Sequence, residues 1–267
     1  MRHALFLPPF DGLADPERIV QLAHAAEESG WDGFFLWDHL LYGSRVRSIL
    51  DPYICLAAVA AATSTIEIGP MVTPLVRRRP AVLARQAVTL DLLSHGRLVL
   101  GLGIGDDFAG EFSSFRDTVD APTRGRMLSE GLGVLNQLLS GEPVNHEGEF
   151  YRAGGDVSFH PTSVRAGGIP IWLAGRWPHP APIRRAAQYQ GIVVIQMSGP
   201  SEMSELQRRL VEAGADLGHF DIVMLRGAGD DASAWADAGV TWLMTQLGPF
   251  GLEFGETMER VAAGPSR

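Results

Sequence analysis

The chain has 267 residues, of which 46% are hydrophobic and 20% charged, and its formal net charge at pH 7 is −9. This composition is typical of a globular protein at the upper end of single-domain length, and the negative field repels nucleic acid and anionic membranes. We therefore expect one domain over residues 1–267, with no nucleic-acid partner and no membrane partner.

All 22 basic side chains are arginines, because the sequence contains no lysine. The absence of lysine excludes Schiff-base chemistry, an internal aldimine with pyridoxal phosphate, and the phosphate-binding lysine of a P-loop. Cys55 is the sole cysteine, which excludes an intrachain disulfide and a thiolate zinc site. No apolar run has the length of a membrane span or the form of a signal peptide, so we expect a cytoplasmic protein.

Short apolar runs alternate with amphipathic segments along the first part of the chain, which is typical of parallel strands joined by helices. A strand is predicted at 4–8, after which Asp15 and Pro16 open a helix that ends near Gly30. The next elements are a strand at 33–37, a helix at 52–63, a strand at 66–73, a helix from 80 that closes at 94–96, and a strand at 97–103.

The regular spacing breaks between residues 105 and 168, a stretch too long for one simple connection. This excursion contains a predicted helix at 123–139 and a Gly-rich segment around Phe150 and Tyr151 that favours a small hairpin. Regular order then returns, with strands at 169–174, 192–196, 221–226 and 240–246, and helices at 184–189, 201–213, 232–238 and near 256.

Roughly eight strand–helix units in a chain of this length predict an α/β fold, specifically a (β/α)8 TIM barrel with an excursion between strands 4 and 5. An open doubly wound sheet is the alternative, but no Gly-rich dinucleotide-binding turn follows the first strand.

The reactive groups of a (β/α)8 barrel lie just past the carboxyl ends of its strands. The second predicted strand ends in Trp37-Asp38-His39, where a carboxylate and an imidazole are adjacent. Because side chains alternate along a strand, we expect one of the two to face the barrel axis and the other the surrounding layer. The imidazole suits proton transfer near neutral pH, and the carboxylate orients it or acts in its place. A hydrogen-bonded structural pair is the alternative.

Gly101, Gly103 and Gly105 fall on one face of the fourth predicted strand. Glycines at the top of a barrel let a flat ring or a phosphate approach the backbone, and Gly103 and Gly105 are the better placed. For Gly101, relief of crowding inside the barrel is the preferred explanation. At the end of the fifth strand, the segment 173–176 offers backbone amides and the Arg176 guanidinium, which suit a phosphate. Alternatively, Arg176 is a surface charge.

Other candidate motifs are weaker. The run 77–79 consists of three arginines, which form either a solvated loop or a contact for an anionic tail. The histidines form neither an HxH motif nor an HExxH helix, and there is no GxSxG motif, so neither a zinc hydrolase nor a serine hydrolase is indicated. Four tryptophans lie in or beside apolar segments and are predicted to pack in the core: Trp31, Trp172, Trp235 and Trp242.

Four stretches of the chain carry a family resemblance: residues 25–43, 60–112, 124–152 and 169–194, which include FFLWDH, RLVLGLGIG and IPIWLAGR. In these stretches the chain resembles the luciferase-like monooxygenase family of flavin- or deazaflavin-dependent oxidoreductases. The resemblance implies a barrel that binds FMN or 8-hydroxy-5-deazaflavin (coenzyme F420) at the strand ends. Many relatives carry a long late insertion over the active site, whereas the late connections here are short. Either the 105–168 excursion covers the mouth, or the site stays open to water.

The resemblance also assigns roles to individual residues. His39 and Asp38 match the second-strand motif at the ring, where histidine is a proton donor or acceptor. The predicted cofactor-binding residues are Val72, Thr73, Gly103, Ile104, Gly105, Asp106, Leu173, Ala174, Gly175 and Arg176. The residues predicted to line a substrate pocket are Phe10, Trp37, Tyr42 and Gln196.

Three functions stay open at this point. In the first, reduced FMN from a partner flavin reductase activates oxygen on a small organic substrate. In the second, the deazaflavin coenzyme moves a hydride; the Asp38–His39 pair favours this, as does an Ala-, Gly- and Arg-rich composition typical of GC-rich genomes. The third is a non-catalytic flavin-binding protein of the same fold. The resemblance also implies a homodimer, which is the commonest soluble assembly.

Overall fold

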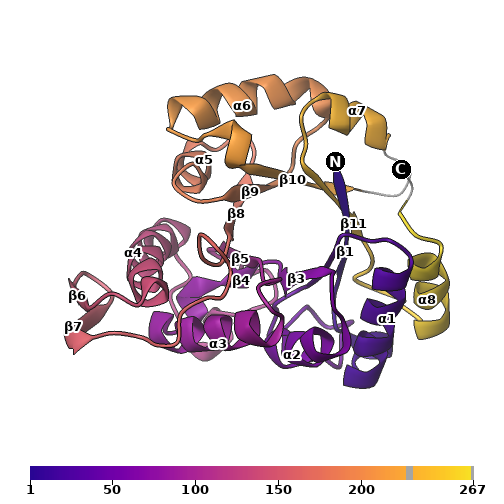
Figure 1. Ribbon diagram of the computed structural model, residues 1–267, viewed down its shortest axis with the longest axis horizontal. Coiled ribbons are helices and arrows are strands. Elements are labelled where there is room, and N and C mark those ends of the chain that lie inside the picture. Colours follow the sequence, from indigo (N-terminus) through magenta and orange to yellow (C-terminus); the bar gives the residue numbers. More distant parts are fainter. Residues whose placement is uncertain (227–230, 266–267) are drawn as a thin grey trace.

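The computed structural model describes residues 1–226 and 231–265. A ring of parallel strands forms its centre, with helices around the outside (Figure 1). The strands are β1 (Arg2–Leu7), β2 (Gly33–Leu36), β3 (Glu67–Pro70), β4 (Thr73–Pro74), β5 (Leu100–Gly103), β8 (Ile171–Arg176), β9 (Gly191–Ile195), β10 (Asp221–Arg226) and β11 (Trp242–Gln246).

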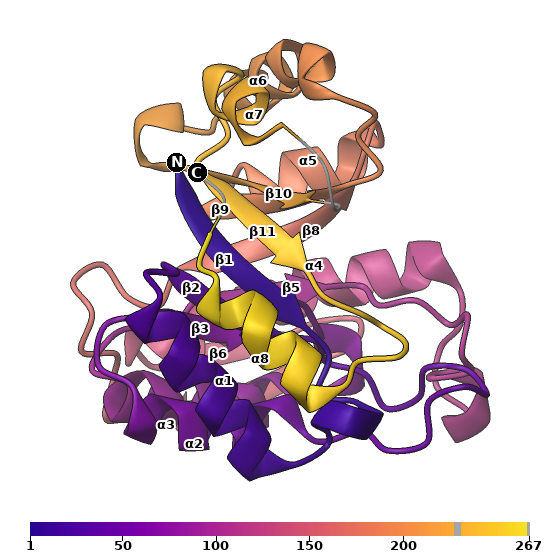
Figure 2. The same ribbon diagram turned by 90° about the vertical axis from the view of Figure 1, so that its right-hand side faces the viewer.

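The strand order is that of a (β/α)8 barrel, as predicted. Neighbouring strands follow the order β3-β2-β1-β11-β10-β9-β8-β5-β4. Figure 2 shows β1 and β11, from opposite ends of the chain, lying side by side. A parallel bridge between Ile68 and Leu98 joins β3 to the segment that enters β5 and so closes the ring. After Met71 and Val72, β4 continues the direction of β3, so the two together occupy one barrel position.

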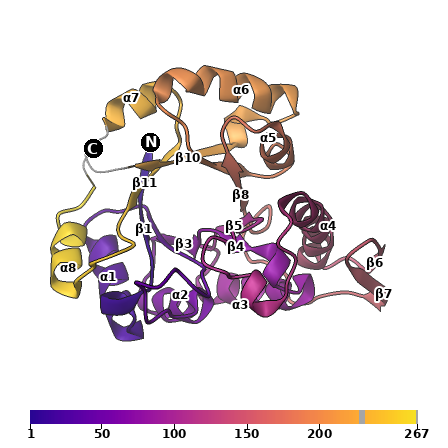
Figure 3. The ribbon, with the colours of Figure 1, turned by 180° about the vertical axis from the view of Figure 1, so that it is seen from behind.

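The helices are α1 (Pro16–Glu28), α2 (Pro52–Ala62), α3 (Pro80–Leu93), α4 (Ala121–Ser140), α5 (Pro180–Ala186), α6 (Met203–Glu212), α7 (Ala232–Asp237) and α8 (Phe254–Ala262). The last helix, α8, packs beside α1 (Figure 3). The predicted excursion contains α4 and an antiparallel hairpin of β6 (Val144–Glu147) and β7 (Arg152–Val157), which projects beyond α4 (Figure 1).

Local sequence explains where several helices begin. Asp15, Asp51 and Asp120 precede α1, α2 and α4, and each carboxylate accepts a hydrogen bond from a backbone N–H of the first turn. A proline in the first or second helical position follows each of them, where its missing N–H costs no helical hydrogen bond.

The structure differs from the prediction at α5, which occupies Pro180–Ala186 and not 184–189. Pro180 and Pro182 both lie in the first turn of this helix, where a missing N–H costs no helical hydrogen bond because these amides have no intrahelical acceptor. The strand before it also extends to Arg176, two residues beyond the predicted end at Ala174. These shifts place the predicted phosphate loop on the end of β8.

Alternation along the strands divides the apolar residues into two cores. On β1, Ala4 and Phe6 point into the barrel interior, whereas Leu5 and Leu7 pack against the helices. The four predicted core tryptophans are buried, two in each core: Trp172 and Trp242 inside the barrel, Trp31 and Trp235 outside it. Within the two described ranges, the helices are too short or too polar to cross a bilayer.

Candidate active site

A cavity of about 1140 Å³ lies at the carboxyl ends of the strands. Its apolar wall includes Phe6 of β1, Val72 after β3, Val193 of β9 and Leu225 of β10. Asp38 and His39, which follow β2, both contribute to the wall. The sequence therefore folds its candidate catalytic pair to the edge of the barrel where a (β/α)8 enzyme carries its active site.

The predicted cofactor-binding residues divide into two groups. Those on the cavity wall are Val72, Gly103, Ile104, Gly105, Asp106, Ala174 and Arg176. Thr73, Leu173 and Gly175 are not on it. Leu173 and Gly175 point outwards, since they alternate along β8 with Ala174 and Arg176: Leu173 belongs to the outer core, and a Cβ on Gly175 would meet Ile192 at 2.9 Å. Thr73 is buried beneath Asp38.

The residues predicted to line a substrate pocket lie off this cavity. Phe10 and Trp37 belong to the core inside the barrel, and Gln196 is exposed just after β9. Tyr42 packs edge-on against the His39 ring, with centroids 4.9 Å apart, and also contacts Phe10. These aromatic side chains therefore pack around His39 and do not line the cavity.

The glycines of β5 approach the neighbouring strands closely. A Cβ on Gly103 would lie 3.0 Å from Val72 and 3.4 Å from Ala174, both on the cavity wall. Deeper in the barrel, a Cβ on Gly101 would lie 2.5 Å from the carbonyl oxygen of Pro70. Gly101 therefore relieves crowding, as expected, and Gly103 keeps the cavity wall flat.

Asp38 is 3% exposed, and both of its carboxylate oxygens are engaged. Oδ1 accepts from Arg77 at 2.9 Å, and Oδ2 accepts from Arg78 at 3.0 Å and from Thr73 Oγ1 at 2.7 Å. Tyr53 in turn hydrogen-bonds Thr73 at 2.9 Å. A carboxylate held in this way is a structural anchor and is poorly placed to take a proton from a ligand.

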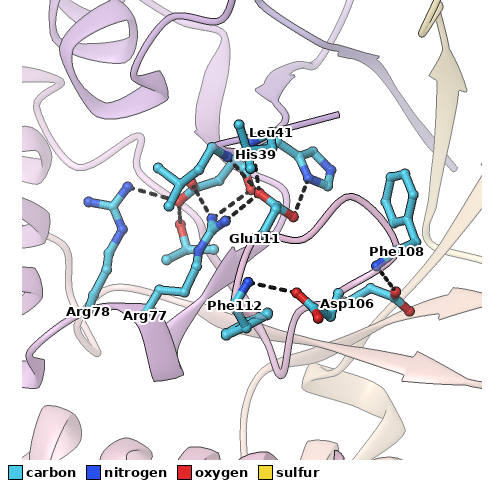
Figure 4. Close-up of polar contacts among 12 residues, drawn as sticks. His39, Leu41, Arg77, Arg78, Asp106, Phe108, Glu111 and Phe112 are labelled. Atoms are coloured by element: carbon cyan, nitrogen blue, oxygen red, sulfur yellow. Dashed lines mark hydrogen bonds and ion pairs between the residues drawn. The ribbon is translucent and has the colours of Figure 1, made fainter. Parts of the chain in front are cut away.

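The carboxylate that contacts the imidazole is Glu111, from the loop after β5 (Figure 4). Its Oε2 lies 2.9 Å from Nδ1 of His39, and its Oε1 accepts from Arg77 at 2.5 Å and from the Leu40 N–H at 2.6 Å. Burial would raise the pKa of Glu111, but the hydrogen bond and charge of His39 and the charge of Arg77 hold it below its usual value.

An ionised carboxylate only accepts hydrogen bonds, so Nδ1 of His39 carries a hydrogen atom and donates a hydrogen bond to Glu111. The second ring nitrogen, Nε2, has no hydrogen-bond partner among the described residues, and the ring lines the cavity. The geometry therefore presents Nε2 of His39 as the nitrogen that a bound molecule can reach.

The run of three arginines is neither a solvated loop nor a free anion contact at its first two positions. The side chains of Arg77 and Arg78 are 5% and 19% exposed. Arg77 joins Asp38 to Glu111, and Arg78 pairs with Asp38 (Figure 4). The cluster neutralises two buried carboxylates at the end of β2.

A different arginine lines the cavity and has no carboxylate in direct contact among the described residues. Arg124 of α4 is 5% exposed, stacks on Phe112 at 4.5 Å and forms no ion pair within the described part of the chain. Its Nε and Nη1 atoms are buried and have no hydrogen-bond partner among residues 1–226 and 231–265. Orphaned guanidinium donors of this kind fit an anionic ligand such as a phosphate.

Sequence reasoning missed Glu111 and Arg124, although each had a signal. Glu111 lies in the loop after a barrel strand, where site residues are expected. Arg124 lies near the N-terminus of α4, where the helix dipole disfavours a cation, so a second cause for its position could have been sought.

The excursion between β5 and β8 forms one side of the cavity. Ala121, Pro122 and Gly125 of α4 line it, as does Phe150 of the connection between β6 and β7. No group of three or more His, Cys, Asp or Glu residues that could hold a metal occurs within residues 1–226 and 231–265. The polar side chains on the cavity wall therefore include the imidazoles of His39 and His179, several arginines, of which Arg124 has buried donors without a partner among the described residues, and carboxylates such as Asp38 and Glu111 that are already paired.

Known proteins are similar to this chain in sequence and in fold. A 5,10-methylenetetrahydromethanopterin reductase from Archaeoglobus fulgidus is 30% identical over 203 residues, which are 74% of this chain and 56% of that protein. An F420-dependent glucose-6-phosphate dehydrogenase from Microbacterium testaceum is 36% identical over 168 residues, 61% of this chain and 48% of that enzyme. The chain thus spans about half the length of the curated relatives it matches.

Among solved structures, the coenzyme F420 dependent tetrahydromethanopterin reductase from Methanopyrus kandleri has a TM-score of 0.75 at 20% identity, covering 98% of this chain and 97% of that one. At this identity, the likeness shows the fold alone. The family model described as luciferase-like monooxygenase matches residues 1–261. The chain therefore belongs to the luciferase-like monooxygenase family.

Proposed function

We propose that this protein is an oxidoreductase that binds a phosphorylated flavin or deazaflavin in the cavity and acts there on a small organic substrate. The observation that carries the proposal is the His39 imidazole on the cavity wall, fixed through Nδ1 by the buried Glu111. The named reductases and dehydrogenases among its relatives support the same class of reaction.

The cavity residues fit such a cofactor. Gly103 and Ala174 present almost no side chain, and Val72 and Ile104 are apolar, so a flat ring has close access to the backbone. The orphaned donors of Arg124 suit the phosphate that both cofactors carry. The volume of about 1140 Å³ exceeds an ordinary ligand pocket and leaves room for a substrate beside the ring.

When bound, the ring would supply hydride transfer, or oxygen activation in the case of reduced FMN. His39 would then hold or move a proton at Nε2, toward the atom of the substrate or ring that gains or loses charge. Glu111 would keep the imidazole in one tautomer and one orientation. Asp38 would act through Arg77, Arg78 and Thr73 as a positioning residue.

Of the two cofactors, we favour coenzyme F420. The family motif around Asp38 and His39 and the F420-dependent relatives both support this choice. Reduced FMN from a separate reductase is the second candidate. It is motivated by a structural neighbour, a type II Baeyer–Villiger monooxygenase from Pseudomonas putida in complex with FMN. That structure has a TM-score of 0.68 at 24% identity, covering 84% of this chain and 66% of that one.

The test is a parallel titration of the purified protein with FMN, reduced FMN and coenzyme F420, followed by fluorescence and difference absorbance at one ionic strength. Tight binding of coenzyme F420 and weak binding of both FMN forms would support a hydride-transferring enzyme and direct the substrate search to alcohols, imines and activated alkenes. A preference for reduced FMN would support an oxygen-using enzyme. Binding of none of the three would overturn the proposed function.

A further inference from the structure

The cavity extends beyond the barrel mouth into the space between α4 and α5. From α4 it is lined by Gly125 and Ser129, and from the segment of α5 by Pro182 and Arg185. Figure 1 shows these two helices as neighbours on one side of the ring. A molecule that fills only the mouth would leave this outer section, here called the α4–α5 groove, without an occupant.

Arg185 crosses the α4–α5 groove, and its hydrogen-bond partners in the described part of the chain are neutral. Its Nε donates to Ser129 Oγ at 2.9 Å, and its Nη2 donates to the Gly125 carbonyl oxygen at 3.1 Å. It forms no ion pair with any residue in the described ranges, and burial lowers the pKa of its guanidinium. The fold therefore holds a partly desolvated cation in place without supplying an anion.

The acidic residues around the outer cavity have partners of their own. Glu149 pairs with Arg126 at 3.3 Å, and Asp106 lies 3.7 Å from Arg176. Glu130 accepts hydrogen bonds from the backbone N–H groups of Phe150 and Tyr151 and contacts His146. The net charge left over in the α4–α5 groove is therefore positive, and it lies on Arg185, with Arg124 further in.

We propose that the α4–α5 groove is an anion-binding subsite, in which Arg185 binds a carboxylate that the ligand carries beyond its phosphate. This inference rests on the proposed function, because it assigns the groove to an extension of the cofactor. A ligand with an acidic tail, such as the glutamyl tail of coenzyme F420, has the required charge and length, whereas FMN ends at its phosphate. Arg185 thereby becomes a residue that selects between the two cofactors.

The experiment compares coenzyme F420 with a truncated, tail-less analogue, the same deazaflavin ending at its phosphate as FMN does, in equilibrium titrations by fluorescence. Wild-type protein is expected to bind the tailed species about tenfold more tightly, the gain expected from one hydrogen-bonded ion pair. In Arg185→Gln this preference should vanish while the affinity for the tail-less species is retained. Arg185→Lys keeps the charge and should restore part of the preference, which should also shrink at high ionic strength.

The matched control is Arg184→Gln, which removes the same charge from an exposed neighbouring position of α5 that does not line the cavity. This variant should keep the full preference for the tail. Thermal unfolding of each variant establishes that it is folded.

Equal affinity of the wild type for both species, or a preference that survives in Arg185→Gln, would overturn the subsite and leave the proposed function standing. Failure of the wild type to bind either species or FMN would overturn both.

Discussion

Nδ1 of His39 lies 2.9 Å from Oε2 of Glu111, a residue 72 positions further along the chain. The contact joins the end of β2 to the loop after β5, at the mouth of the barrel (Figure 4). Because Glu111 is 1% exposed and is itself held by Arg77 and the Leu40 N–H, the imidazole has one orientation in which Nε2 is left for a ligand. A proton carrier on a rigid support is what general acid–base catalysis requires.

The first prediction concerns His39. The variant His39→Ala should bind coenzyme F420 within several-fold of wild type but turn over about 10²-fold more slowly, because it lacks the positioned proton carrier. Affinity is measured by fluorescence titration and turnover by coenzyme absorbance with the best substrate of a panel of alcohols, imines and activated alkenes. Unchanged turnover would remove His39 from the mechanism.

The second prediction separates positioning from catalysis at Glu111. If the carboxylate acts through the imidazole, Glu111→Gln should slow turnover in the wild-type background and have no further effect in His39→Ala. The measurement is a double-mutant cycle on kcat, with coenzyme affinity determined for all four proteins. Additive losses would mean that Glu111 contributes independently of His39.

The third prediction concerns Arg77, which neutralises Asp38 and Glu111 together. Arg77→Gln should destabilise the fold by about 3–5 kcal/mol, because it leaves buried carboxylates without their shared counter-ion. Urea unfolding measures the change. Arg79→Gln, in the same arginine run but exposed, should stay within about 0.5 kcal/mol of wild type. Equal effects of the two substitutions would contradict the assigned role.

The fourth prediction follows from Glu27, whose carboxylate accepts from the backbone N–H groups of Ser64, Thr65 and Ile66. Burial raises the pKa of Glu27, but these hydrogen bonds outweigh it and lower the pKa from 4.5 to about 2. A depressed carboxyl pKa adds stability that is present above pH 4.5 and is lost as the pH falls toward 2.

Glu27→Gln should therefore melt at a lower temperature than wild type at pH 7, and the difference should narrow between pH 4.5 and 2. Thermal unfolding followed by circular dichroism at several pH values measures it. Glu28→Gln is the control, since its side chain is exposed and lies 3.4 Å from Nδ1 of His24 in a surface pair. A gap in melting temperature that does not depend on pH would refute this account of Glu27.

The fifth prediction contrasts two glycines of β5. Gly101→Ala should destabilise the barrel, because its Cβ would meet the Met71 sulfur and the Pro70 carbonyl. Gly103→Ala should leave the fold largely intact and weaken cofactor binding, because its methyl group would stand on the cavity wall beside Val72.

The melting temperature of each variant measures the effect on the fold, and a fluorescence titration with coenzyme F420 measures the effect on cofactor binding. Gly133→Ala, with open space around an exposed position of α4, serves as the control and should be neutral or slightly stabilising. Unimpaired cofactor binding by Gly103→Ala would mean that the ring does not approach this strand.

Local patterns in the sequence predicted most of the fold. The order of strands and helices follows from alternating apolar runs, and helix starts follow from pairs such as Asp15 with Pro16. The predicted end of β8 was two residues too early and the predicted start of α5 was four residues too late. Prolines in a first helical turn have the same local pattern as prolines in a loop, which hides the start of α5. The position of His39 at a strand end was likewise predictable, because barrel strands end at one edge.

Local residue patterns were thus enough to predict the barrel and the residues at its mouth. The contacts among those residues depend on tertiary packing: Glu111 and not Asp38 contacts His39, Arg77 is buried between two carboxylates, and Arg124 and Arg185 form no ion pair among the described residues. Periodicity and capping act between neighbours in the chain, so they carry no information on these contacts. Ion pairing and desolvation depend on side chains from different strands and helices, which become neighbours when the ring closes.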